Sequence, residues 1–123
     1  MKKSVVVIGT GPCGLVAVKE IIAAGHDVRA FERSSSLGGV FSSAAYYPDL
    51  HLTISNWAMS FSDFPDPQRL CYPSGESYLQ YLKDCARHFG LECLITYNSE
   101  VYSAELKKDR RWALKIRQRH QSG

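Results

Sequence analysis

Hydrophobic and polar positions divide the first third of the chain into three elements. Residues 4–8 form a short β-branched run, which predicts a strand buried on both faces. The apolar segment 15–23 predicts a helix, and Gly25 supplies the positive φ that commonly closes one. A second short strand is predicted at 28–31. Strand, helix and strand in this order indicate a right-handed βαβ unit at 1–33 with parallel strands.

The remaining pattern predicts three further segments. Residues 34–74 are rich in turn residues but also in aromatic residues, so we expect an ordered loop segment that packs against the domain. Residues 75–97 follow the N-cap residue Ser74 and predict a helix and then a short strand. At 98–123, two alternating strands around the turn 107–110 predict an antiparallel β-hairpin. The whole chain is expected to be one incomplete α/β domain.

A glycine fingerprint lies between the first predicted strand and the helix. Gly9 permits a tight turn, Gly11 lets the backbone approach a pyrophosphate, and Gly14 allows close packing of helix on strand. Pro12 suits the first helical turn, whose N–H groups and dipole favour an anion. Glu32, at the end of the second strand, is placed to accept hydrogen bonds from a ribose with a free 2′-OH. The pattern therefore favours NAD or FAD over NADP at this site.

Four segments together resemble the N-terminal, FAD-binding region of the flavin-containing monooxygenases (dimethylaniline monooxygenase-like). They are "VVVIGTGPCGL", "FERSSSLGGVF", "FSDFP" and "YLQYLKDCARHFGL", in this order. The resemblance implies a Rossmann-type FAD-binding domain of the glutathione-reductase type. It also implies that NADPH and O2 are used to oxygenate a small-molecule substrate. The positions that match the family's FAD contacts, or stand beside them, are Gly9, Gly11, Pro12, Cys13, Gly14, Glu32, Arg33, Gly39, Val40, Phe41 and Val101.

Two residues are candidates for a catalytic role near the flavin. The family has an asparagine upstream of its F-x-D-F-P segment, and Asn56 in "LTISNWAMSFSDFP" is the evident match. Ungapped counting back from Phe61 instead puts Thr53 at that position. Either side chain can hydrogen-bond a flavin. The alternative, that Asn56 only shapes a turn, stays open.

The chain also departs from the family. It holds one glycine fingerprint, so the family's NADPH domain is absent, and we expect a truncated N-terminal portion that is inactive by itself. Without the strand that normally returns to the parallel sheet, a sheet edge is expected to be open. Self-association through this edge is therefore a possible consequence.

Charge and composition narrow the classes of partner. The net charge of +3 comes from the segment 107–119, where basic residues alternate along one solvent-exposed face of a predicted strand. This alternation is typical of an ordinary solvated face, so we expect no nucleic-acid partner. The cysteines and histidines show no metal-ligand spacing, and we expect no metal. No stretch approaches the ~20 apolar residues of a membrane segment, so a cytoplasmic protein is expected.

Two alternative functions remain. An amine-oxidase-type flavoprotein shares the fingerprint, but that family favours arginine after the second glycine pair, where this chain has Val40. The second alternative is a non-catalytic nucleotide-binding module that truncation has left. Such a module would purify without flavin colour.

Overall fold

The computed structural model describes residues 1–42 and 47–119 and has a mixed α/β architecture, as predicted. Residues 120–123, the end of the predicted hairpin segment, lie outside the described residues. The elements in chain order are β1 (Ser4–Ile8), α1 (Pro12–Ala23), β2 (Asp27–Phe31), the 3₁₀ turn η1 (Gly39–Phe41), α2 (Asn56–Met59), α3 (Gly75–His88), the 3₁₀ turn η2 (Glu92–Leu94), β3 (Ile95–Thr96), β4 (Ser99–Leu106) and β5 (Trp112–Gln118).

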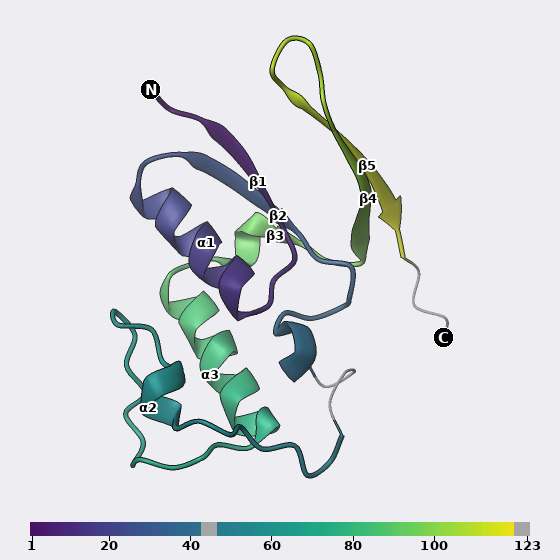
Figure 1. Cartoon of the computed structure of the whole chain (residues 1–123). Helices are drawn as coiled ribbons and strands as arrows, with labels where there is room; N and C mark the ends of the chain where they lie inside the picture. Colours follow the sequence, from purple (N-terminus) through teal and green to yellow (C-terminus); the bar gives the residue numbers. More distant parts are fainter. Residues whose placement is uncertain (43–46, 120–123) are drawn as a thin grey trace.

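A three-stranded parallel sheet in the order β1-β2-β3 organises the domain. β1 and β2 pair from Ser4 with Asp27 to Ile8 with Phe31, with α1 as the crossover between them. Figure 1 shows α1 and α3 on one side of this sheet, with the hairpin β4–β5 projecting away from it. This arrangement confirms the predicted βαβ unit and places the carboxyl ends of β1 and β2 beside the start of α1.

The core lies between the sheet and the two long helices. Leu15 and Val18 of α1 meet Val28 and Ala30 of β2, and Leu82 of α3 completes the contact. Leu82, Val18 and Ala30 are fully shielded from solvent. Burial of this apolar area supplies the main driving force that holds α1 and α3 against the sheet.

The prediction that β1 is buried on both faces is wrong. Val5 and Val7 are half-buried beneath the helices, whereas Val6 and Ile8 are 41% and 58% exposed. Successive side chains of a strand point to opposite faces, and the helices cover only one face of this sheet. Among the described residues, no second layer covers Val6 and Ile8 closely.

Helix α3 begins and ends as its sequence predicts. The Ser74 hydroxyl accepts a hydrogen bond from the backbone N–H of Ser77 at 3.1 Å, which satisfies one free donor of the first turn. Glu76 lies in that turn, where the helix dipole favours a negative charge. At the other end, Gly90 has φ +67°, a conformation that glycine adopts without strain.

The segment before α3 is anchored by Tyr81. Its hydroxyl donates to the backbone carbonyl of Phe64 at 2.6 Å and accepts from the backbone N–H of Phe61 at 2.7 Å. The rings of Phe61 and Phe64 pack against that of Tyr81. Phe61 and Phe64 are therefore packed as predicted, whereas Tyr47, Trp57 and Tyr72 are 65%, 55% and 67% exposed. Tyr46 lies outside the described residues.

Lys19 connects α1 to the same segment. Its side chain is 7% exposed, and its ammonium lies 2.5 Å from carboxylate oxygens of both Asp63 and Glu20. The ammonium also lies 5.3 Å from the centre of the Phe89 ring. A shielded cation requires such partners, because burial of an unpaired charge is strongly unfavourable.

The predicted hairpin is present, with β4 and β5 antiparallel from Ser99 opposite Gln118 to Leu106 opposite Trp112. The turn closes through a hydrogen bond from the N–H of Lys107 to the carbonyl of Arg111 at 2.8 Å. Leu106 and Trp112 are 56% and 64% exposed, so the outer end of the hairpin has no apolar cover from the described residues.

Substitution of Gly14 by alanine tests the close packing of α1 on β1. A Cβ at Gly14 would lie 2.0 Å from the carbonyl oxygen of Gly9, so Gly14→Ala is expected to lower the free energy of unfolding by about 3 kcal/mol. Gly25→Ala is the control, because Gly25 directly follows the C-cap of α1 and a Cβ there meets no atom within 4 Å. Its positive φ alone is expected to lower stability by about 1 to 2 kcal/mol. Urea unfolding measures the free energy of unfolding of both variants. Equal decreases in the two variants would contradict the close packing at Gly14.

Candidate functional site

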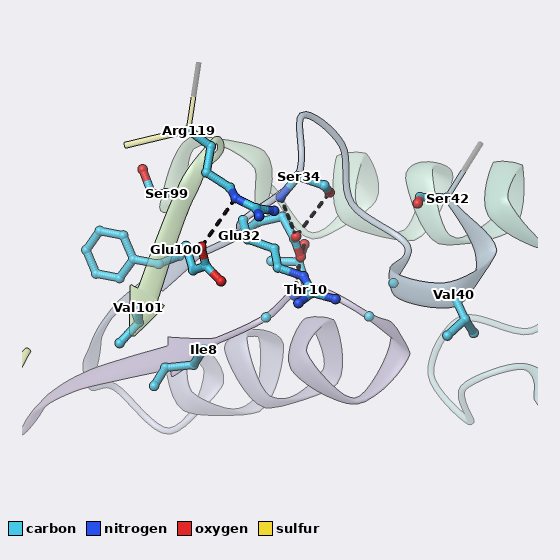
Figure 2. Close-up of a pocket in the computed structure, with 15 residues that line it drawn as sticks. Ile8, Thr10, Glu32, Ser34, Val40, Ser42, Ser99, Glu100, Val101 and Arg119 are labelled. Atoms are coloured by element: carbon cyan, nitrogen blue, oxygen red, sulfur yellow. Dashed lines mark hydrogen bonds and ion pairs between the residues drawn. The ribbon is translucent and has the colours of Figure 1, made fainter. Parts of the chain in front are cut away.

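A cleft of about 820 Å³ opens at the carboxyl ends of β1 and β2 (Figure 2). In parallel α/β sheets, ligands bind in the crevice outside the carboxyl ends of the strands. Its size falls within the range of small-molecule and cofactor pockets. The cleft is lined by Ile8, Gly9, Thr10, Gly11, Phe31, Glu32, Arg33, Ser34, Gly39, Val40, Ser42, Ser99, Glu100, Val101 and Arg119.

The glycine turn after β1 presents bare backbone to this cleft. Gly9 has φ +93°, and a Cβ added there would meet no atom within 4 Å. Gly11 is the N-cap of α1, with Pro12 at the first helical position. No side chain caps this helix and no acid lies in its first turn, so its first N–H groups and the positive end of its dipole are available to an anion. The turn therefore fits a diphosphate, as the fingerprint predicts.

The second glycine pair packs directly on the first glycine turn. The N–H of Gly38 donates to the carbonyl of Thr10 at 2.9 Å. A Cβ at Gly39 would lie 3.0 Å from the Cα of Gly11, and one at Gly38 would lie 2.5 Å from a methyl carbon of Leu79. Both clusters thus form one continuous backbone surface, which side chains would force apart.

Glu32 holds this surface together from below. Its side chain is 6% exposed. One carboxylate oxygen, Oε1, accepts from the N–H of Thr10 at 2.9 Å and from its hydroxyl at 2.8 Å. The other, Oε2, accepts from the N–H of Ser34 at 2.8 Å and from its hydroxyl at 3.0 Å. Figure 2 shows the hydrogen bonds to Ser34 and Thr10 as dashed lines that converge on Glu32.

These hydrogen bonds determine the charge of Glu32. Burial is the largest single influence and acts to raise its pKa, because it disfavours the charged form. The hydrogen bonds from Ser34 and Thr10 together outweigh burial, so the pKa of Glu32 is lowered. The site therefore presents an ionised carboxylate, the form that accepts hydrogen bonds from ribose hydroxyls and repels a phosphate.

The hairpin closes one side of the cleft. Ser99, Glu100 and Val101 at the start of β4 line it, and the guanidinium Nε of Arg119 lies 3.3 Å from a carboxylate oxygen of Glu100. Sequence analysis assigned Arg119 to a solvated strand face. Arg119 is 53% exposed and also lines the cleft, because it continues the register of the hairpin beside Asn98, whose carbonyl accepts from the Arg119 N–H at 2.7 Å.

The predicted cofactor residues divide into two groups. Those that line the cleft are Gly9, Gly11, Glu32, Arg33, Gly39, Val40 and Val101. Those that support it from outside the lining are Pro12, Cys13, Gly14 and Phe41. Within the second group, Phe41 packs its ring edge-on against Tyr78 with centroids 4.8 Å apart.

The two predicted catalytic residues lie outside the lining of this cleft. The Asn56 side chain is buried; its amide nitrogen donates to Asp66 and to the Arg69 carbonyl, each at 3.1 Å, and its oxygen accepts from the Cys71 N–H at 3.0 Å. These bonds hold the turn between α2 and α3. Thr53 is exposed on the same segment. A catalytic role for either residue stays a prediction.

Sequence reasoning did not identify the hydroxyl residues of the cleft. Thr10, Ser34, Ser42 and Ser99 all line it. Thr10 occupies a variable position of the glycine fingerprint, and Ser34 lies in a run of three serines that reads as a turn. The only available signal was the proximity of both residues to Glu32 once the two strands are aligned.

Two wider searches of the described residues bear on the class of site. In 1–42 and 47–119, no group of three or more His, Cys, Asp or Glu side chains is arranged to hold a metal ion. Across the same ranges, no helix has the length and apolar character that crossing a membrane requires.

Replacement of Glu32 tests whether its charge stabilises the fold. Because its pKa is lower in the folded chain, its contribution is present above the unfolded value of about 4.5 and is lost as pH falls through the folded value. Glu32→Gln is therefore expected to reduce stability at pH 7 and to flatten the pH dependence of unfolding below about pH 5. Denaturant unfolding across this range measures the effect. The control is Glu92→Gln at an exposed position, and identical pH profiles for the two variants would contradict the assignment.

The chain is similar to known proteins of one family. The flavin-binding monooxygenase-like (FMO-like) family matches residues 2–115. A Marinomonas mediterranea protein named 4-hydroxybenzoate brominase (decarboxylating) is 44% identical over 117 residues, which cover 94% of this chain and 22% of that protein. The Arabidopsis thaliana flavin-containing monooxygenase FMO GS-OX-like 1 is 31% identical over 94% of this chain and 30% of its own length.

Solved structures that superpose on this chain also include oxygenases. An oxidised steroid monooxygenase bound to NADP superposes with a TM-score of 0.85 and 29% identity, over 94% of this chain and 23% of that one. The S-allyl-L-cysteine S-oxygenase of Allium sativum superposes with a TM-score of 0.82 and 25% identity, over 94% of this chain and 32% of that one. The chain thus spans less than a third of the length of these proteins. With the family match covering nearly all of its residues, the chain belongs to the flavin-binding monooxygenase-like family.

Proposed function

We propose that the cleft binds FAD and that the chain is the FAD-binding part of a flavin-dependent monooxygenase, which uses NADPH and O2 to oxygenate a small molecule. The observation that carries this proposal is the pairing of an uncapped helix start at Gly11 with an ionised, buried Glu32. One binds a diphosphate and the other a ribose, and both line the same cleft. When bound, FAD would supply the redox chemistry with NADPH and O2 that membership of this family implies.

The chain's own residues would bind and orient the cofactor. The N–H groups at the start of α1, around Cys13, hold the diphosphate, and Gly39 leaves room for the cofactor to pass. Val101 on β4, Arg33 after β2 and Val40 in η1 also line the cleft and would contact the bound cofactor. Pro12, Gly14 and Phe41 keep these backbone groups in place from behind.

The charge of Glu32 supports FAD over NADP at this position. A 2′-phosphate would place two negative groups together in a buried site, where their repulsion is poorly screened. NADPH would accordingly bind elsewhere in the complete protein. This division of sites is consistent with the solved relative that is described as bound to NADP and that is several times longer than the matched region.

A second candidate activity is bromination of a phenolic acid. It is favoured by the 44% identity to the Marinomonas mediterranea protein named 4-hydroxybenzoate brominase. The FAD cleft would serve both activities equally. Consumption of bromide during turnover of the full-length protein distinguishes bromination from oxygenation.

FAD binding by the chain is the direct test of the first proposal. Titration of FAD with the purified protein is expected to quench flavin fluorescence to saturation, and ADP is expected to displace the flavin, because both share the diphosphate and ribose. Glu32→Gln is expected to weaken FAD binding by about tenfold or more, since a hydrogen bond to a charged acceptor is worth about 1.5 to 3 kcal/mol.

Two outcomes would contradict the proposal. One is the failure of a correctly folded wild-type chain to bind FAD at all. The other is an equal affinity of Glu32→Gln and the exposed control Glu92→Gln, which would show that the cofactor does not contact the carboxylate.

We also propose that the isolated chain self-associates through β1. Among the described residues, β1 has a paired strand on one side only, and beside this edge Val6 and Ile8 lie on the uncovered face of the sheet. An open strand edge with apolar side chains is a template for pairing with another copy. Sedimentation equilibrium is expected to show dimers for the wild type and monomers for Val6→Lys. Leu70→Lys, at a site that is 59% exposed but outside the sheet, should resemble the wild type; loss of dimers in both variants would argue against the edge.

A further inference from the structure

Donors of the chain occupy three acceptor positions of the Glu32 carboxylate, and a fourth donor, the Ser34 hydroxyl, lies within reach of Oε2. An ionised carboxylate offers about four lone-pair sites. Thr10 supplies two hydrogen bonds to Oε1, the Ser34 N–H supplies one to Oε2, and the Ser34 hydroxyl oxygen lies 3.0 Å from Oε2. A ribose hydroxyl can therefore donate to the remaining position on Oε2 only while the Ser34 hydroxyl does not, or if one of the other three donors gives up its acceptor.

Three of the four donors have no alternative. The N–H groups of Thr10 and Ser34 are fixed by the backbone, and the Thr10 hydroxyl is fully buried. The Thr10 hydroxyl has, among the described residues, a hydrogen bond to Glu32 and to no other acceptor. Displacing any of these would leave a buried donor unpaired, which is unfavourable.

The Ser34 hydroxyl differs because a second acceptor lies within its reach. Its oxygen is 3.0 Å from Oε2 of Glu32 and 2.7 Å from the backbone carbonyl of Ser36. A hydroxyl carries one hydrogen, so a rotation about its C–O bond moves the donated bond from one acceptor to the other. The Ser34 side chain is half-buried at the cleft wall, so this rotation takes place where a ligand can reach Oε2.

We infer that Ser34 is a specificity-determining residue: its hydroxyl competes with the nucleotide ribose for Oε2 of Glu32 and turns to the Ser36 carbonyl when a ribose hydroxyl binds. This inference rests on the proposed function of the cleft. Every donor stays paired in this rearrangement. The Ser34 hydroxyl donates to the neutral Ser36 carbonyl, and the ribose hydroxyl donates to the charged Oε2 of Glu32. The preference for ribose over deoxyribose is therefore smaller than it would be if no hydroxyl of the chain competed for Oε2 of Glu32.

The test compares ADP with 2′-deoxy-ADP by isothermal titration calorimetry. The measured quantity is the ratio of the two affinities in the wild type and in Ser34→Ala. Without the competing hydroxyl, the ratio is expected to rise by about fivefold, since hydrogen bonds to charged acceptors exceed those to neutral ones by about this factor. Ser34→Thr, which keeps a hydroxyl, is the matched control and is expected to restore the wild-type ratio.

The affinity ratio in Ser34→Ala and the binding of ADP by the wild type separate the inference from the proposed function. An unchanged or smaller ratio in Ser34→Ala overturns the inference while leaving FAD binding intact. Failure of the wild type to bind ADP overturns the proposed function, and the inference with it. Thermal unfolding verifies that each variant is folded. Ser34→Cys, whose thiol is a weak donor, is a second variant that should behave as the alanine does if Ser34→Ala does not fold.

Discussion

A buried carboxylate can remain ionised only if hydrogen bonds replace the water that it has lost, and this requirement organises the cleft. Glu32 meets it by binding the turn after β1 through Thr10 and the turn after β2 through Ser34. Its backbone extends the same connection, because its N–H donates to the Thr96 carbonyl and its carbonyl accepts from the Ser99 N–H, each at 2.9 Å. One residue thus connects the parallel sheet, the first glycine turn, the segment after β2 and the start of the hairpin, while the Gly38 N–H holds the second glycine pair to Thr10.

The contact between the two glycine clusters follows from that arrangement. Once Glu32 draws the turns together, Gly39 approaches Gly11 so closely that a Cβ on Gly39 would lie 3.0 Å from the Gly11 Cα. The glycines that lie far apart in the sequence are therefore neighbours in one wall. Their shared property is the absence of a side chain, which serves both the packing between the turns and the approach of a ligand backbone.

The parts of this structure that local sequence determines were predictable. The fingerprint, the N-cap at Ser74 and the hairpin depend on residues close in the chain, and all three are present as expected. The burial of β1 was predicted wrongly, because it depends on which layers cover the sheet. Arg119 lines the cleft because the start of the hairpin is joined to Glu32 through the Ser99 N–H, a contact between distant segments that no local pattern encodes. Tertiary contacts, which lie outside any sequence window, decided these cases.

Lys19 joins two regions that have separate tasks. It lies on α1, whose first turn faces the cleft, and its ammonium is shielded between Glu20 and Asp63. A change of Asp63 to a neutral residue would remove one of two counter-ions from a cation with little access to water. Positions 19 and 63 are therefore expected to covary among homologues, with a neutral residue at one accompanied by a neutral residue at the other.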